Sequence, residues 1–235
     1  NVQDIIMVVN YILNAGNVDF DIDVECADMD SNEALQVLDI IQIVDIILAG
    51  NRTSADATKA SLDIEDGSVR LVSNGFISAV QMTIEHDGDF SIDLTEKAMF
   101  SAYKTTGSST TLIVVAPEGD ELFNASGDFS IGEVTVGNNS GELNVAMPTE
   151  LTLSKAYPNP FNPSTTMDMY IPSEGIVNLN VYNVMGQLVD VIHSGSMTQG
   201  SHTITWNASN MTSGMYFVRA ESAGGVSVQK VMLMK

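Results

Sequence analysis

Oxygen-bearing side chains recur at alternate positions in the segment DMDSNEALQVLD, which runs from Asp28 to Asp39. Asp28, Asp30 and Asn32 stand at positions 1, 3 and 5 of a twelve-residue loop, and Asp39 stands at position 12. Alternate positions allow these oxygens to converge on one hard cation, and this is the spacing of a calcium loop. The sequence therefore predicts a Ca²⁺ site here.

The other positions of this loop complete the predicted shell and depart from the usual pattern. Ala34 would offer its main-chain carbonyl, and Gln36 would act directly or through a water molecule. Glu33 stands where a glycine normally makes the sharp turn, and position 12 is Asp39 rather than the longer glutamate. We expect a structural ion, because dense like charges repel and a divalent cation relieves that repulsion while it orders the loop. The alternative is an acidic turn without a metal.

The chain around this loop repeats itself: aligning Asp4 with Asp39 superimposes residues 2–13 on residues 37–48. Apolar residues recur at helical spacing in both segments, so we predict two helices. The apolar faces comprise Ile5, Val8, Val9 and Ile12 in the first segment, and Ile40, Ile43, Val44 and Ile47 in the second. These faces exceed what one helix pair buries, so we expect the pair to pack on a sandwich, its own or a neighbour's.

An aspartate at position 12, with one helix after each of two loops, resembles the type I dockerin module. The resemblance implies that residues 1–50 form a calcium-binding helical module with a truncated first loop. Asn1 would be position 9 of that loop and Asp4 its position 12. Between the helices, the acids at 19, 21, 23 and 25 suggest either a third site or, as we favour, a solvated acidic linker.

Residues 51–59 are polar and predict a linker, and residues 60–148 predict a β-sandwich. Turn signals such as Asp66-Gly67 and Asp87-Gly88 separate the predicted strands, and no segment shows helical periodicity. The strands are expected at 60–65, 68–73, 79–85, 90–94, 99–103, 110–116, 128–136 and 143–147, in a sandwich of eight or nine strands. Residues 77–82 and 122–132 resemble the cohesin family, whose members bind dockerins. A generic bacterial sandwich is the alternative.

The segment YPNPFNP, from Tyr157 to Pro163, opens the last part of the chain. Each proline restricts its own φ and drives the residue before it toward extended geometry, which predicts a stiff extended segment. Short runs separated by turn residues follow at 167–171, 177–182, 188–192, 202–206, 215–220 and 226–233. Short strands at regular spacing indicate a small β-sandwich.

This last pattern resembles the type A C-terminal sorting domain of proteins exported by the type IX secretion system of the Bacteroidetes and relatives. The matching residues are YPNPFNP, then Val181-Tyr182-Asn183 with Gly186-Gln187, then Gly200, Trp206, Ser213-Gly214-Met215-Tyr216 and the ending KVMLMK. The resemblance covers residues 151–235, and the alternative is a generic immunoglobulin-like domain.

The resemblance implies an immunoglobulin-like sandwich and a sorting signal that the secretion machinery reads, including the outer-membrane translocon and sortase-associated components. The signal residues would be Pro158, Asn159, Pro160, Gly186, Gly214, Tyr216, Lys230 and Lys235. The protein would pass through the periplasm and end secreted or at the cell surface. Family members often lose this domain by a cut upstream, which we expect within residues 146–153. Val231 and Leu233 should face the core.

The formal net charge of −21 is unevenly distributed along the 235 residues. Residues 1–51 contain ten acids and no Lys or Arg, residues 52–150 contain sixteen acids and five bases, and residues 151–235 contain four of each. This division favours separate modules, and it argues against nucleic acid and anionic membrane surfaces as partners. The sequence has no apolar run of transmembrane length. Cys26 is the only cysteine, so no internal disulfide forms, and we expect it to be small, apolar and partly buried.

Catalytic signals are absent from the sequence. His86, His193 and His202 have no triad partner at a recognisable spacing, and there is no nucleophile elbow, phosphate loop or zinc spacing. Trp206 is expected to fill a core. We therefore predict a mainly β, non-enzymatic chain with two sandwiches and a small helical module, forming the C-terminal region of a longer protein.

Two functions follow from these patterns. The first is an export and spacer region, in which a sorting signal follows calcium-stabilised structural modules. The second is a calcium-dependent assembly module, in which cohesin-like and dockerin-like parts pair within or between chains and build a surface scaffold or filament. The mass in solution with and without a chelator would discriminate between them.

Overall fold

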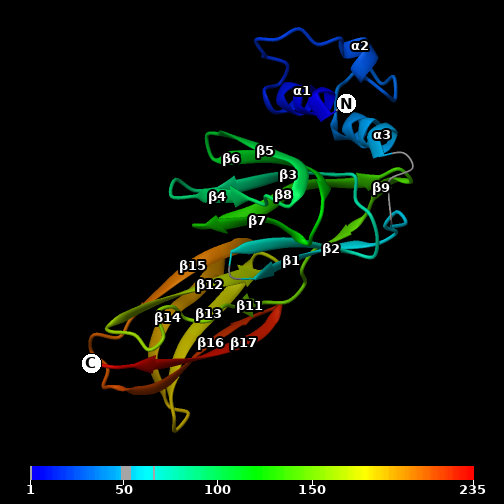
Figure 1. Cartoon of the computed structure of the whole chain (residues 1–235). Helices are drawn as coiled ribbons and strands as arrows, with labels where there is room; N and C mark the ends of the chain where they lie inside the picture. The colour runs from blue at the N-terminus through cyan, green and yellow to red at the C-terminus, as the bar shows by residue number, and fades with distance from the viewer. Residues whose placement is uncertain (1, 49–53, 66) are drawn as a thin grey trace.

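The computed structural model describes residues 2–48, 54–65 and 67–235. The chain is mainly β, as predicted, with helices at one end and two sandwiches arranged obliquely below them (Figure 1). The middle sandwich is formed by strands β1 to β10, and the C-terminal sandwich by strands β11 to β17. The N-terminal helices and the C-terminus lie at opposite ends of the molecule.

Two long helices have the predicted bounds, α1 at Val2–Leu13 and α3 at Val37–Leu48. A short helix that the sequence did not predict, α2 at Val24–Ala27, interrupts the expected acidic linker. The side-chain oxygen of Asp23 caps it by accepting a 3.1 Å hydrogen bond from the Cys26 amide. The expectation for Cys26 was wrong: it is exposed, because this single turn buries none of its residues.

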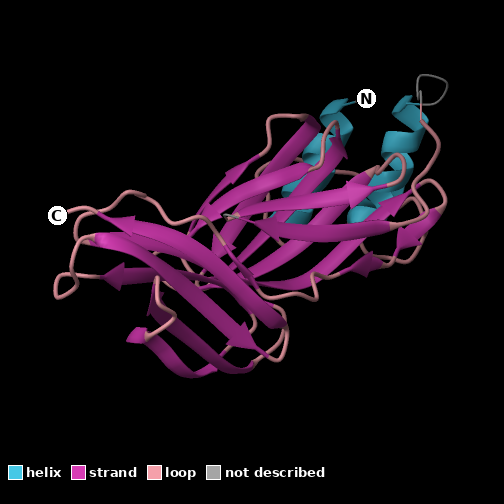
Figure 2. Ribbon diagram, turned by 90° about the horizontal axis from the view of Figure 1, so that it is seen from below, coloured by secondary structure: helices cyan, strands magenta, loops and turns pink. Residues whose placement is uncertain are grey.

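The two long helices cover the outer face of one sheet of the middle sandwich (Figure 2). Ile5, Val9 and Ile40 are fully buried in one cluster with residues of β3 and β6. This packing agrees with the expectation that the helix pair needs a sheet to cover its remaining apolar surface. On β8, Gly137 lies where any Cβ would meet the tip of Ile41, so the glycine lets α3 approach the strand closely.

Strand β6, Ser109–Pro117, lies in the middle of three layers, with the helices on one face and the second sheet on the other. Leu112 and Val114 face the core between the sheets, and Ile113 and Val115 face the helices; all four are fully buried. An unbroken apolar run, rather than an alternating one, is what burial on both faces requires.

Within the described residues, ten strands form the middle sandwich. Their bounds are β1 Ala60–Glu65, β2 Ser68–Ser73, β3 Ala79–His86, β4 Ser91–Leu94, β5 Ala98–Thr106, β6 Ser109–Pro117, β7 Glu121–Ser126, β8 Phe129–Asn138, β9 Gly141–Leu143 and β10 Val145–Ala146. One sheet has the order β10-β1-β2-β7-β4, and the other contains β8-β3-β6-β5 with β9 beside β8. The expectation of eight or nine strands was therefore too low.

Two local features explain the difference in strand number. Strand β7 was not predicted because its two large apolar residues, Leu122 and Phe123, are adjacent, so the sequence there lacks alternation. A register shift in the pairing of β7 with β2 next to Val69 turns both side chains inward. The single strand expected at 143–147 is divided, because the chain leaves β8 after Leu143 and joins β1 in the other sheet.

Part of the predicted linker is attached to the middle sandwich. Ala57 is buried, its amide donates a 3.0 Å hydrogen bond to the Phe76 carbonyl, and the Phe76 amide donates one of 2.8 Å to Ala55. The Asn138 side chain donates to the Ala57 carbonyl at 2.8 Å. Residues 55–57 thus belong to the sandwich, while residues 49–53 of the connection lie outside the described part.

The C-terminal sandwich contains all six predicted strands, lengthened at their ends, and one additional short strand. The bounds are β11 Thr152–Leu153, β12 Ser164–Ile171, β13 Gly175–Asn183, β14 Leu188–Met197, β15 Gly200–Asn207, β16 Gly214–Ser222 and β17 Gly225–Leu233. One sheet has the order β14-β13-β16-β17, and the other contains β11-β12-β15. Val231 and Leu233 face the core, as predicted.

Candidate functional site

The Asp28 loop brings three of the predicted metal ligands together. One carboxylate oxygen from each of Asp28, Asp30 and Asp39 lies within 4.8 Å of the other two. Asp39 is fully buried at the start of α3, and its two oxygens accept 2.8 Å hydrogen bonds from the amides of Met29 and Gln36. Two main-chain amides of the loop thus fix the position of the Asp39 carboxylate at its last position.

The centre of the loop makes the turn for which a glycine was expected. Glu33 adopts φ +68° and Ser31 adopts φ +59°, both in the left-handed region that glycine adopts without cost. The carboxylate of Asp28 accepts hydrogen bonds from the amides of Asn32 at 3.2 Å and Glu33 at 2.7 Å. Side-chain to main-chain hydrogen bonds therefore hold a glutamate in a glycine conformation.

The other predicted ligands are placed as follows. Asn32 adjoins the group, since its side-chain amide donates a 2.9 Å hydrogen bond to Asp30. Ala34 and Gln36 are exposed residues of the same loop. Asp4, assigned to the truncated first loop, lies on α1 and lines a separate cavity with Met7 and Cys26, and Asn1 lies outside the described residues. Among the residues that the structure describes, no second group of three His, Cys, Asp or Glu side chains comes as close, so the acids at 19–25 form no third cluster.

The donor set of the Asp28 loop fits calcium chemically. Carboxylate oxygens are hard ligands, and Ca²⁺ prefers such ligands in flexible loops. Asp28, Asp30 and Asp39 would hold the ion, and the ion would neutralise three carboxylates that now lie within a few ångströms of one another. Its role would be structural.

The proline-rich segment at Tyr157–Pro163 lies along the last strand, β17. The Asn159 side-chain amide donates a 3.1 Å hydrogen bond to the Lys230 carbonyl, and its oxygen accepts one of 2.9 Å from the Met232 amide. The prolines on either side of Asn159 have no N–H to donate, so the asparagine side chain makes the contacts that a backbone would make in a sheet. The segment covers an edge that would otherwise be open to strand pairing.

Phe161 continues this contact and enters the core. It exchanges main-chain hydrogen bonds with Met232 at 2.9 Å and Met234 at 3.0 Å. Its ring lies 5.3 Å from Trp206, and Trp206 lies 5.5 Å from Tyr216, measured between ring centroids. Trp206 is buried, as expected for a core residue. The motif residues Phe161, Trp206 and Tyr216 therefore form one aromatic cluster.

The remaining motif residues serve turns and strand ends. Gly186 adopts φ +75° in the turn between β13 and β14, where the Asn183 side chain accepts hydrogen bonds from the Met185 and Gln187 amides. Gly214 is the first residue of β16 and pairs with Leu233 at the end of β17.

The two lysines of the signal are exposed on or just after β17. Lys230 is opposite Phe217 on β16. The Lys235 ammonium donates a 2.6 Å hydrogen bond to the Ser209 carbonyl. Pro158 accepts at its carbonyl from the Thr165 hydroxyl at 2.7 Å. The predicted signal residues are thus distributed around the last strand and its neighbours.

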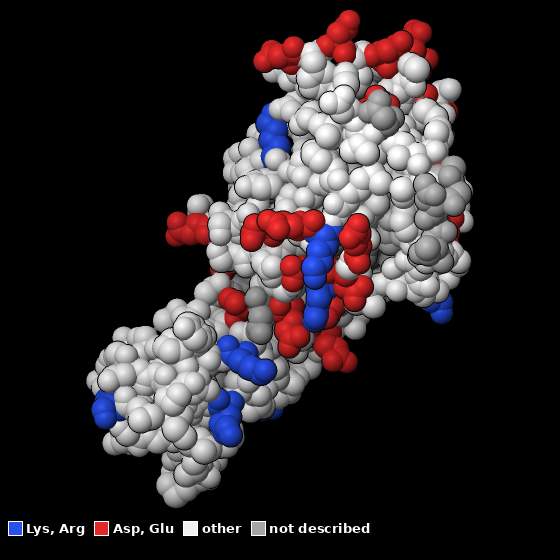
Figure 3. Space-filling view, viewed as in Figure 1, with Lys and Arg blue, Asp and Glu red and all other residues white. Residues whose placement is uncertain are grey.

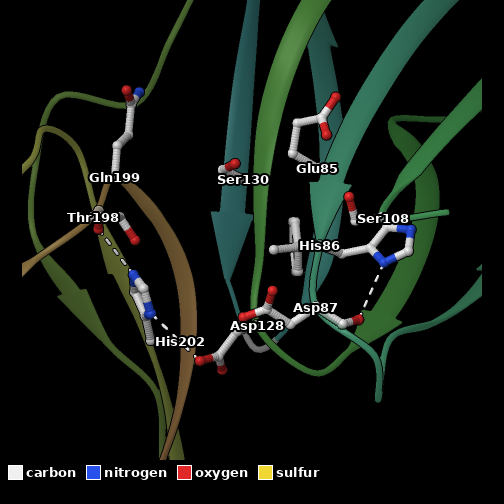
Figure 4. Close-up of a pocket in the computed structure, with 10 residues that line it drawn as sticks. Glu85, His86, Asp87, Ser108, Asp128, Ser130, Thr198, Gln199 and His202 are labelled. Atoms are coloured by element: carbon white, nitrogen blue, oxygen red, sulfur yellow. Dashed lines mark hydrogen bonds and ion pairs between the residues drawn. The ribbon is translucent and has the colours of Figure 1, made fainter.

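A surface pocket lies between the two sandwiches, with His86 and His202 on opposite sides (Figure 4). His86 stacks on Phe90 with ring centroids 4.1 Å apart, and its Nε2 lies 2.8 Å from the Thr110 hydroxyl. The Nε2 of His202 donates to the Thr198 carbonyl at 2.9 Å. His86 contacts its own side of the pocket, and His202 contacts Thr198 on its own side and lies 3.6 Å through Nδ1 from Asp128 on the other, so both histidines make structural contacts.

The acidic residues gather on the helices and the middle sandwich in the view of Figure 3, while the C-terminal sandwich shows isolated basic residues on an otherwise uncharged surface. This distribution agrees with the uneven charge of the sequence. In the part of the chain that the structure describes, no helix is both long and apolar enough to cross a membrane.

Comparison with known protein families identifies the C-terminal sandwich. Residues 155–234 match the family model described as a secretion system C-terminal sorting domain. The match covers this stretch and not the whole chain, and it supports a C-terminal sorting signal for type IX secretion. No curated protein matches the chain.

Solved structures show only a weak overall likeness. A Dscam structure concerned with isoform specificity is 14% identical over 77% of this chain and 46% of its own length, with a TM-score of 0.23. The titin I-band fragment I67-I69 is 15% identical over 77% of this chain and 64% of its own length, with a TM-score of 0.24. The alignment thus spans about half of the Dscam chain, and no conclusion about function follows from similarities at this level.

Proposed function

We propose that this chain is the C-terminal region of a secreted or cell-surface protein, in which a sorting signal follows structural modules stabilised by calcium. The match of residues 155–234 to the sorting-domain family carries this proposal. The translocon and the sortase-associated components are the partners that this function requires. The chain supplies no chemistry of its own in this proposal.

The contact between the proline-rich segment and β17 supports a role for the chain end in export. Asn159 and Phe161 attach the start of the sorting domain to its last strand through four hydrogen bonds. A machinery that reads a folded signal would therefore meet both ends of the motif on one surface. The removal of the last strand would disrupt that surface and the core beneath it.

The export proposal is tested by deleting residues 231–235 from the full-length protein in its host. The expected result is accumulation in the periplasm and loss from the cell surface, because Val231 and Leu233 leave the core and Phe161 loses its main-chain contacts. A matched variant, Lys104→Ala, changes an exposed residue of the middle sandwich and should reach the surface normally. Normal surface levels of the deleted protein would refute the sorting role.

Calcium binding by the Asp28 loop is the second element of the proposal. The clustering of Asp28, Asp30 and Asp39 supports it. Isothermal calorimetry of the Asp28→Ala/Asp30→Ala variant should show no calcium uptake at this loop. In the unaltered chain, a chelator should reduce the protection of α3 from hydrogen exchange, and in the variant the chelator should leave that protection unchanged. Asp21→Ala, in the acidic segment before α2, is the matched control and should bind like the unaltered chain. Equal uptake by all three would exclude this loop.

A calcium-dependent cohesin–dockerin-type assembly is the alternative function. The apolar contact of α1 and α3 with the middle sandwich supports an interaction within one chain, because the helices already cover the face that a second chain would need. Sedimentation of the intact chain with and without chelator discriminates between the functions. A monomer under both conditions supports the spacer role, and a calcium-dependent oligomer supports assembly.

A further inference from the structure

One aromatic side chain of the C-terminal sandwich is buried in the neighbouring sandwich. Tyr170 on β12 is only 4% exposed, and it packs into the hydrophobic core of the middle sandwich instead of the core of its own domain. A large buried aromatic residue is the kind of anchor that carries most of the energy of a protein interface.

The edge of strand β15 makes a second contact with the middle sandwich. Ser201 pairs with Phe129 at the start of β8, so the sheets of the two sandwiches are continuous at this point. Gly200 allows this approach, because a Cβ there would meet the Phe129 carbonyl oxygen. Backbone pairing of this kind fixes the register of one domain against the other.

Asp128 closes the same contact with a charged group. Its carboxylate accepts a 2.6 Å hydrogen bond from the Thr203 amide, and its other oxygen lies 3.6 Å from Nδ1 of His202 (Figure 4). A hydrogen bond to a carboxylate is stronger than one between neutral groups. The edge of β15 is thus held at consecutive residues by one short segment of the middle sandwich.

The covalent connection between the sandwiches is separate from this interface. Met147 packs against the core of the middle sandwich, and Leu151 is buried in the core of the C-terminal sandwich. Thr149 and Glu150 between them are exposed. A cut at these two residues would leave Tyr170, Asp128 and the β15 edge in place.

We propose that the junction is a docking interface in its own right, which holds the C-terminal sandwich on the middle sandwich after the connecting chain has been cut. The two domains recognise each other through the Tyr170 anchor, the β15 edge and Asp128. The occurrence of a cut within residues 146–153 at the cell surface rests on the proposed function. After such a cut, the sorting domain stays bound without a covalent link until the interface opens.

The test inserts a recognition sequence for a site-specific protease between Thr149 and Glu150 of the complete 235-residue chain. After complete cleavage at micromolar concentration, size-exclusion chromatography should show both fragments in one peak at the mass of the uncut chain. In Tyr170→Ala the fragments should elute separately. Tyr157→Ala is the matched control, because Tyr157 is 82% exposed in the same sandwich, and its fragments should stay together.

A second variant keeps the test decisive if Tyr170→Ala fails to fold, which circular dichroism before cleavage reveals. Asp128 is half exposed, so Asp128→Ala leaves both cores intact, and it should raise the dissociation rate of the cut fragments about tenfold. Separation of the unaltered fragments immediately after cleavage would overturn the proposal, as would equal dissociation rates in the unaltered chain and Asp128→Ala. Neither outcome depends on whether the chain is exported by the proposed route.

Discussion

The side-chain oxygen of Asn159 accepts a 2.9 Å hydrogen bond from the main-chain amide of Met232, which joins the start of the sorting domain to its last strand. The same side chain donates to the Lys230 carbonyl at 3.1 Å. A single asparagine between two prolines thus takes the place of a backbone amide and carbonyl in a strand pair. The motif needs an asparagine there because both prolines lack a donor.

Asn159→Ala should destabilise the C-terminal sandwich. The change removes the hydrogen-bond partners of the Lys230 carbonyl and the Met232 amide, which can then bond only to water. We therefore expect a loss of about 1–3 kcal/mol in the free energy of unfolding. Urea denaturation followed by Trp206 fluorescence measures it. Asn210→Ala, at an exposed turn of the same sandwich, is the control, and an equal effect of the two substitutions would contradict the role of Asn159.

Glu33→Gly should tighten calcium binding by the Asp28 loop. Glu33 holds a φ of +68°, which costs a non-glycine residue on the order of 1 kcal/mol and costs glycine nothing, so the affinity should rise about fivefold if the ion selects this conformation. Calorimetric titration with Ca²⁺ gives the change. Glu25→Gly, outside the loop, should not raise the affinity, and an unchanged or weaker affinity in Glu33→Gly would show that the turn is not part of the site.

Gly137→Ala should weaken the docking of α3 on the middle sandwich, because the new Cβ meets Cδ1 of Ile41. We expect a cost of about 1 kcal/mol in unfolding free energy. Ile41→Val removes that same methyl group and should cost about 0.5–1.5 kcal/mol by itself. The double variant should be less destabilised than the sum of the two, which a double-mutant cycle measures. Simple additivity would mean that Gly137 and Ile41 do not meet.

Stability should fall at alkaline pH because of Tyr170. Burial raises the pKa of its phenol above the ordinary value of 10.0, and the hydrogen bond with Gln199 lowers it by a smaller amount. The folded chain therefore holds this proton more tightly than the unfolded chain. The resulting stability is complete below the unfolded pKa and is lost as the pH rises through the folded pKa.

The contribution of the Tyr170 hydroxyl is isolated by measuring the free energy of unfolding of the unaltered chain and of Tyr170→Phe at pH values below and above about 10. The phenylalanine variant keeps the buried ring and lacks the ionising hydroxyl, so its stability should fall less steeply with rising pH. Parallel pH profiles for the two proteins would show that the Tyr170 hydroxyl is not desolvated at the junction.

The sequence by itself determined the elements that depend on local pattern. Both long helices have their predicted bounds, since Ile and Val recur at helical spacing and each helix has an aspartate in its first turn. The strands Ala60–Glu65 and Ser68–Ser73 also have their predicted bounds, because the sequence separates two alternating runs by the turn signal Asp66-Gly67. The aspartates of the Asp28 loop could be grouped for the same reason, since their spacing along one short loop is enough to bring them together.

The tertiary structure decided whatever depends on contacts between distant segments. The bulge that turns Leu122 and Phe123 inward arises from the pairing of β7 with β2, and the division between β9 and β10 arises because each pairs with a different sheet. No periodicity of the local sequence encodes either pairing. Tyr170 likewise lies in an ordinary alternating strand, and only the position of the neighbouring sandwich turns it from a residue of one domain into an anchor in the core of another.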